Sequence, residues 1–189
     1  MTQKKYFPII ISSPSGGGKS TVCDEILARR NDVAYSISYT TRKPRKNETD
    51  GVDYYFISRE KFNQMLKQDV FAEWAKVHGH LYGTSKKVVK NVLNKNKHVI
   101  LDIDTKGARQ LMSAYPQSLS IFLFPPSMKE LENRLRKRET DNEADIQLRL
   151  KNAKQEFADA TDYDVLLVND DLDRLVEKIL KIIDNKSLK

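Results

Sequence analysis

A glycine-rich turn between a predicted strand and a predicted helix is the feature that most constrains this chain. The turn follows the β-branched run Phe7–Ser12, and apolar residues at helical spacing from Val22 to Leu27 then indicate a helix ending near Arg30. The turn reads Ser13-Pro14-Ser15-Gly16-Gly17-Gly18-Lys19-Ser20. This is the spacing G-x-x-x-x-G-K-S/T with Ser13 in place of the first glycine, so the sequence predicts a phosphate-binding loop.

The chemistry of such a loop predicts a site for the polyphosphate of a nucleoside triphosphate. Glycines let successive backbone N–H groups converge on an anion, and the N-terminus of the following helix adds partial positive charge. We expect Lys19 to bridge the terminal phosphates, the Ser20 hydroxyl to face Mg²⁺, and the whole stretch Ser13–Thr21 to bind the nucleotide. The alternative, a flexible turn with a solvated lysine, is disfavoured by the strand before the loop and the helix after it. The loop alone does not distinguish a motor protein, a molecular switch and a kinase.

The rest of the chain alternates strands with helices. Apolar runs with little alternation recur at Val99–Ile103, Leu119–Phe124 and Val165–Val168, and they indicate strands buried on both faces. Helical patterns separate these runs, and a last one extends from Leu172 to Ile183. This order predicts an α/β fold, in which a parallel sheet is flanked by helices with right-handed crossovers.

Two stretches interrupt the alternation and predict insertions into the core. Residues 37–84 are rich in Tyr, Thr, Gly and charge, with one helical pattern near Phe62 and strand-like pieces around Asp53–Ile57 and Leu81–Tyr82. Residues 125–151 begin with two prolines and carry several arginines on otherwise helical sequence. We therefore expect one domain over 1–189, with a core of 1–36, 85–124 and 152–189, an inserted lobe at 37–84 and a lid at 125–151.

Composition narrows the class of protein. The 189 residues include 33 Lys+Arg and 26 Asp+Glu, which gives a formal net charge of +7. A protein with this positive charge can bind nucleic acid, an anionic membrane or small phosphorylated ligands. The single cysteine, Cys23, excludes an intramolecular disulfide and fits a reducing compartment, so we expect a cytoplasmic location. The apolar runs are too short to span a bilayer or to form a secretory signal.

Further motifs occur in a fixed order after the phosphate loop, and together they resemble the guanylate kinase family of P-loop enzymes, which phosphorylate GMP. The resemblance covers essentially the whole chain, and its motifs are Ser36–Lys46, Asp50–Phe56, Glu73-Trp74, Tyr82-Gly83-Thr84, Leu101–Asp104 and Val168–Asp171. It implies a P-loop kinase core in which 37–84 is a GMP-binding lobe and 125–151 a lid. It also implies the substrates ATP and GMP (with dGMP) and the cofactor Mg²⁺.

The resemblance implies a set of GMP-binding residues. The family's residues matching Ser38, Glu73, Thr84 and Asp104 read guanine, and those matching Arg42, Arg45, Tyr54 and Tyr82 hold its phosphate. The chemistry agrees, because a carboxylate accepts from guanine N1–H and N2–H whereas adenine N1 is itself an acceptor. Taken singly, these residues could be solvated charges or packing tyrosines. The role of Asp102 stays open: it contacts GMP, contacts waters of the metal, or organises nearby arginines.

The resemblance also implies four catalytic cations. Arg138 and Arg149 match the family's lid arginines, which act with Lys19 and Arg45 on the transferring phosphoryl group. Asn169, with Asp170 nearby, matches the position beside the adenine of ATP. Two other lid arginines, Arg134 and Arg136, are expected to form a salt-bridged helix face with Glu130 and Glu132.

Other residues have simpler interpretations. Cys23 is expected in the core, and His78, His80 and His98 on the surface or in loops. Six lysines and no acidic residue lie from Lys76 to Lys97, so much of the charge excess adjoins the expected GMP lobe. Two other functions are a guanylate-kinase-like module that binds a protein and has lost catalysis, and a P-loop protein that binds nucleic acid. We expect neither, and no nucleic acid, membrane or obligate protein partner.

Overall fold

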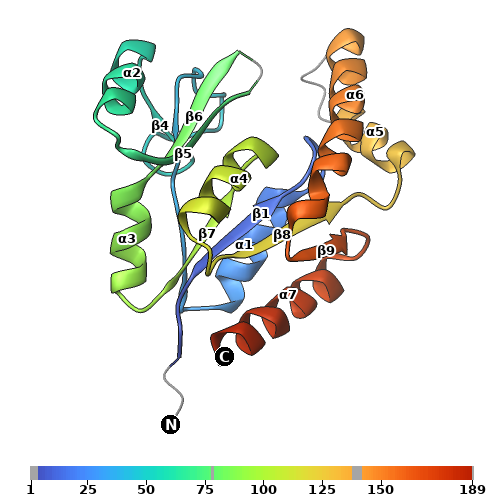
Figure 1. The fold of residues 1–189 in the computed structure, drawn as a ribbon. Coiled ribbons are helices and arrows are strands. Elements are labelled where there is room, and N and C mark those ends of the chain that lie inside the picture. Colours follow the sequence, from blue (N-terminus) through green and yellow to red (C-terminus); the bar gives the residue numbers. More distant parts are fainter. Residues whose placement is uncertain (1–3, 78, 138–141, 189) are drawn as a thin grey trace.

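A five-stranded parallel sheet forms the centre of the molecule (Figure 1). The computed structural model describes residues 4–77, 79–137 and 142–188. The sheet has the strand order β2-β7-β1-β8-β9, with β1 (Pro8–Ser12), β2 (Val33–Tyr35), β7 (His98–Asp102), β8 (Leu119–Phe124) and β9 (Val165–Val168). The α/β fold expected from the sequence is therefore confirmed. Within the described residues, no helix is long and apolar enough to cross a membrane.

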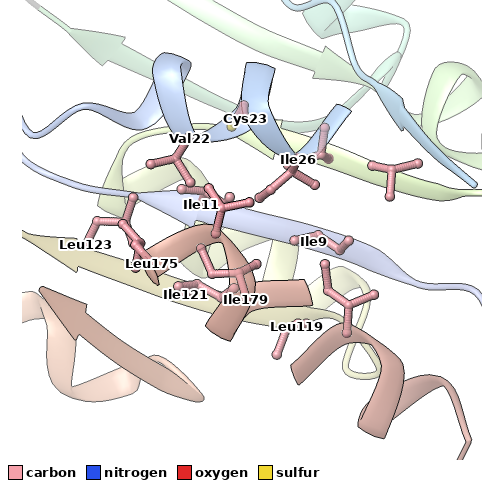
Figure 2. Packing of buried hydrophobic residues seen from close by; sticks show 14 of the residues in the cluster. Ile9, Ile11, Val22, Cys23, Ile26, Leu119, Ile121, Leu123, Leu175 and Ile179 are labelled. Carbon is pink, nitrogen blue, oxygen red and sulfur yellow. The ribbon is translucent and has the colours of Figure 1, made fainter. Parts of the chain in front are cut away.

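Helices bury both faces of this sheet. Ile9 and Ile11 of β1 pack with α1 (Lys19–Arg29) and α7 (Leu172–Ser187), as Figure 2 shows, and Cys23 lies in this cluster as expected. Ile10 points to the other face, into a cluster with residues of α3 (Lys86–Asn94) and α4 (Thr105–Ala114). A strand whose successive side chains are all buried needs no polar alternation, which explains its continuous apolar sequence.

A second sheet lies to one side of the first and is formed within residues 37–85 (Figure 1). Its order is β4-β3-β6-β5, with β3 (Tyr39–Thr40), β4 (Tyr55–Phe56), β5 (Phe71–Val77) and β6 (His80–Ser85). The helix α2 (Arg59–Lys67) supplies Phe62 and Met65 to a small separate core beneath this sheet. A mixed sheet with its own core therefore lies where the sequence interrupts the α/β alternation, with β3 parallel to β4 and the other pairs antiparallel.

Two helices pack together on the opposite side of the molecule. They are α5 (Met128–Arg136) and α6 (Glu143–Asp159), and their common core contains Leu131, Leu135, Ile146 and Ala153. Helix α6 continues from this pair to the central sheet, where its Phe157 packs beside Phe122 of β8. A short 3-10 helix, η1 (Ala160–Asp162), links α6 to β9.

Two expectations about burial are wrong. His98 is fully buried as the first residue of β7, where its Nδ1 accepts a hydrogen bond from Phe7 N at 3.3 Å and Ser187 Oγ lies 3.3 Å from its Nε2. β9 is not buried on both faces, since Leu166 and Val168 remain half exposed. The reason is that β9 is the last strand of the sheet, and only its alternate residues Val165 and Leu167 face α7. His80 begins β6 half-buried, and His78 lies outside the described residues.

Candidate active site

The phosphate-binding loop joins the carboxyl end of β1 to the first turn of α1. Gly16 and Gly18 both have φ of 90°, a left-handed conformation that glycine adopts without steric cost. A Cβ at Gly18 would also collide with Asn169 Nδ2. Ser13 keeps a backbone angle open to any residue, since the described non-glycine residues with positive φ are Asp69 and Asn96. The missing first glycine therefore does not strain the turn.

The loop forms one wall of a cavity of about 530 Å³. Opposite the loop, the cavity reaches the second sheet, so one space connects the predicted triphosphate site to the predicted GMP residues. The lining includes most of the residues predicted from the sequence: Ser13 to Thr21 without a gap, Ser38, Arg45, Tyr54, Glu73, Tyr82, Asp102, Asp104 and Arg149. Val77, Ile103 and Glu156 complete it.

A buried carboxyl group defines one end of the cavity. Glu73 on β5 is 3% exposed, and its Oε1 accepts a hydrogen bond of 2.6 Å from Thr84 Oγ1 on β6. Ser38 Oγ lies 3.2 Å from the same Thr84 hydroxyl. Burial raises the pKa of Glu73 to about 7, and the hydrogen bond from Thr84 opposes that rise. Asp104 lies nearby and caps α4 by accepting from Lys106 N and Gly107 N, each at 2.8 Å.

Arginines and tyrosines gather at the lobe end of the cavity. Arg42 forms two hydrogen bonds of 2.8 Å to the two oxygens of Glu48 and one of 3.2 Å to Tyr82 Oη. Its guanidinium also lies 5.4 Å from the centre of the Tyr54 ring. Glu48 accepts from Arg45 N at 2.7 Å as well, so one carboxylate fixes both arginine-bearing positions. Arg42 does not itself line the cavity; Arg45 does.

A second buried carboxyl group lies at the foot of the phosphate loop. Asp102, at the end of β7, accepts hydrogen bonds from Ser20 Oγ at 3.3 Å and from Tyr35 Oη. Burial raises the pKa of Asp102, and the hydrogen bond from Tyr35 and the charge of Lys19 oppose the rise. A hydroxyl and a carboxylate facing one another are hard oxygen donors of the kind that suits Mg²⁺. The residues present therefore fit that ion.

Helix α6 brings one arginine to the loop. Arg149 Nη1 donates a hydrogen bond of 2.5 Å to Ser15 Oγ. The other predicted lid arginine, Arg138, lies outside the described residues. The expected salt-bridged face is confirmed, because Arg134 pairs with Glu130 at 2.9 Å and Arg136 with Glu132 at 2.7 Å.

Comparison with known proteins agrees with this arrangement. The family model described as guanylate kinase matches residues 5–186. The chain belongs to the guanylate kinase family. The guanylate kinases of Caldanaerobacter subterraneus and Carboxydothermus hydrogenoformans are 45% and 47% identical to it, each over 96% of this chain and over 88% and 89% of their own lengths. The crystal structure of a guanylate kinase from Anaplasma phagocytophilum matches with a TM-score of 0.83 at 32% identity, covering 100% of this chain and 89% of that one.

The residues predicted to lie beside adenine have other partners in the structure. Asn169 is buried, and its side-chain Nδ2 donates to Gly17 O at 2.8 Å, while its backbone carbonyl oxygen accepts from Arg134 Nη2 at 3.1 Å. Asp170 is exposed and pairs with Arg174 at 2.7 Å. Neither residue lines the cavity described above. Asn169 thus holds the backbone of the phosphate loop.

Three residues that contribute to the site were missed by sequence reasoning. Glu48 holds Arg42, Tyr35 holds Asp102, and Glu156 lines the cavity from α6. A signal exists for Glu48, because a lone acid after four closely spaced cations predicts an ion pair. Tyr35 carries no such local signal, since its partner Asp102 lies 67 residues away in sequence. Glu156 carries none either, since the phosphate loop that lines the same cavity is near the opposite end of the chain.

Proposed function

We propose that the protein transfers the γ-phosphoryl group of ATP to GMP and forms ADP and GDP. The observation that carries this proposal is the opening of the phosphate loop and of the Glu73–Thr84–Ser38 network onto one cavity. The carboxylate accepts from guanine N1–H and N2–H, and hydroxyl groups donate to guanine O6. AMP presents an acceptor at N1 and would leave the buried carboxylate unpaired, so the site rejects it.

We propose that the chain consists of a core, a GMP-binding lobe and a lid around the cavity. Residues 37–84 form the GMP-binding lobe, 125–151 the lid, and 1–36, 85–124 and 152–189 the core. Ser38, Glu73, Thr84 and Asp104 face guanine, with dGMP as a further acceptor substrate. Arg42, Arg45, Tyr54 and Tyr82 hold the phosphate of GMP, with Asp102 on the side of the phosphate loop.

The transfer step depends on alignment and charge neutralisation. An oxygen of the GMP phosphate attacks the γ-phosphorus in line, and the bond from that phosphorus to the β–γ bridging oxygen breaks, leaving ADP. Lys19, Arg45, Arg138 and Arg149 are the proposed catalytic cations. Ser20 would hold Mg²⁺, with Asp102 contacting its waters. When bound, that ion neutralises charge on the β- and γ-phosphates.

ATP binds along Ser13–Thr21 in this proposal. Asn169 and Asp170 lie on the adenine side, where the Asn169 amide keeps the loop in shape while the nucleotide exchanges. The free nucleotides are the partners, with no nucleic acid, membrane or obligate protein partner, and we place the protein in the cytoplasm. The single buried cysteine fits a reducing compartment.

A coupled assay with Mg·ATP and GMP, dGMP, AMP, UMP or CMP tests this function. We expect GDP formation from GMP to be far faster than diphosphate formation from AMP, UMP or CMP. Comparable rates with AMP and UMP would overturn the guanine assignment. Tight GMP binding without turnover would favour a binding module, and a steeply salt-dependent affinity for DNA or RNA would favour a nucleic-acid partner.

A further inference from the structure

Glu156 faces the cavity, and the proposed transfer reaction gives it no role. It lies seven residues after Arg149 on α6, which is two helical turns, so the two side chains share one face of the helix. Arg149 reaches Ser15 of the phosphate loop, which identifies that face as the one turned to the nucleotide site. Glu156 is itself part of the cavity lining.

One carboxyl oxygen of Glu156 lacks a donor in the described part of the chain. Its Oε2 is buried and has no hydrogen-bond partner among the described residues. Burial raises the pKa of Glu156 to about 7; Lys19 and Lys106 oppose the rise, and Asp104 and Asp159 add to it. A buried acceptor without a donor costs free energy, so this oxygen is an open position for a hydroxyl or N–H group in the cavity.

The position of Glu156 along the cavity indicates which part of a nucleotide it meets. Among the groups that act on its charge are Lys19, on the phosphate side, and Asp104, beside the guanine-facing Glu73. The part of GMP that joins guanine to phosphate is the ribose. A carboxylate repels phosphate and accepts hydrogen bonds from hydroxyl groups, and ribose offers two of them.

We infer that Glu156 accepts a hydrogen bond from a ribose hydroxyl of GMP and is the residue that distinguishes ribose from deoxyribose. This inference rests on the proposed function. It adds a third contact region to guanine and phosphate recognition, supplied by the helix that also carries Arg149.

Steady-state kinetics with GMP, 2′-deoxy-GMP and 3′-deoxy-GMP tests the contact. For the unaltered enzyme we expect the analogue that lacks the contacted hydroxyl to have kcat/KM lower by about tenfold or more, since hydrogen bonds to charged groups are the strong ones. In Glu156→Ala this ratio should fall to about one. Glu156→Gln keeps an acceptor without the charge and should give an intermediate ratio. Glu177→Gln, an exposed acid on α7, is the control and should keep the original ratio.

Several outcomes would overturn the inference. An unchanged ratio in Glu156→Ala, or no preference for GMP over either analogue in the unaltered enzyme, removes the contact. An equal loss for all three substrates in Glu156→Ala shows a structural role only. Calorimetric binding of the same three nucleotides gives the same ratios without turnover, so a failure of catalysis is distinguished from a failure of ribose recognition. Absence of GMP binding would overturn both proposals.

Discussion

In the proposed reaction, phosphoryl transfer depends most directly on Lys19. Its Nζ donates to Ser13 O at 2.9 Å, which places the ammonium inside the curve of the phosphate loop. We predict that Lys19→Ala lowers kcat by about 10²–10³-fold, in the range seen when one charge-stabilising donor is removed. The circular dichroism spectrum should stay the same, and Lys178→Ala, an exposed lysine on α7, should keep full activity. Normal turnover of Lys19→Ala would refute its role.

Glu73 determines the choice of base in the proposed site. Glu73→Gln keeps the shape of the side chain but turns one acceptor into an N–H₂ donor, which then faces the N–H donors of guanine. We predict that KM for GMP rises about tenfold or more, because a charge-assisted hydrogen bond of roughly 1.5–3 kcal/mol is lost. KM for ATP serves as the internal control and should hold. If GMP affinity is unchanged, guanine binds elsewhere.

At the residue scale, the sequence predicts groups whose chemistry is set by a motif and misses groups whose chemistry is set by folding. Arg149 and Glu73 are predicted from ordered motifs, and both line the cavity. His98 is misplaced because its burial depends on Phe7 and Ser187, which lie about 90 residues away on either side. No local pattern records such partners.

The phosphate loop is the element whose backbone is most restricted. Gly18→Ala forces alanine into φ of 90° and pushes its methyl group into Asn169 Nδ2, whose hydrogen bond holds Gly17 O. We predict a loss of about 10²-fold in kcat/KM for ATP, the scale expected when a catalytic element is displaced by about 1 Å.

Gly79→Ala is the matched control for this change. Gly79 has φ of 84° in the β5–β6 turn, and a Cβ there would meet nothing within 4 Å. Both variants lose about 1–2 kcal/mol of unfolding free energy through the left-handed backbone. Only Gly18→Ala should lose ATP turnover. If ATP turnover is the same in both variants, the phosphate loop tolerates the added methyl group.

At the element scale, a long and uninterrupted apolar run makes a strand predictable. β8 has six residues, and its expected bounds, Leu119–Phe124, are confirmed. β2 and β3 have three and two residues, too few to show a period, and neither was expected. β5 was also missed, since Glu73 and Lys76 interrupt its apolar pattern. Glu73 is buried at the site that we propose for guanine, and this proposed function would explain why the local pattern is overridden.

For the whole molecule, His98 links stability to pH. Burial lowers its pKa in the folded state, although Asp32 and the hydrogen bond from Phe7 N oppose that effect. The unfolded chain therefore binds a proton first as pH falls below about 6.5, and the unfolding free energy decreases until pH passes the lowered pKa. Glu73 and Glu156, whose pKa burial raises to about 7, titrate in the same range with the opposite sign. The loss should therefore appear as a difference in slope between the unaltered chain and His98→Asn in urea unfolding between pH 8 and 5. His98→Asn keeps an acceptor without a titrating group, and an unchanged slope in that variant would exclude His98 as the cause.

Net charge acts at the largest scale. From Lys76 to Lys97 there are six lysines and no acids, and Lys87 and Lys90 are exposed on α3, near the lobe that we propose binds GMP. A field of this sign raises the rate at which anionic nucleotides arrive, and salt screens it over about 10 Å at 0.1 M.

Stopped-flow association of a fluorescent GMP analogue should therefore slow as ionic strength rises. The double variant Lys87→Glu and Lys90→Glu should weaken this salt dependence and leave kcat unchanged, because neither residue lines the cavity. Association rates insensitive to ionic strength would show that these lysines are only solvated helix positions and that nucleotides arrive without steering.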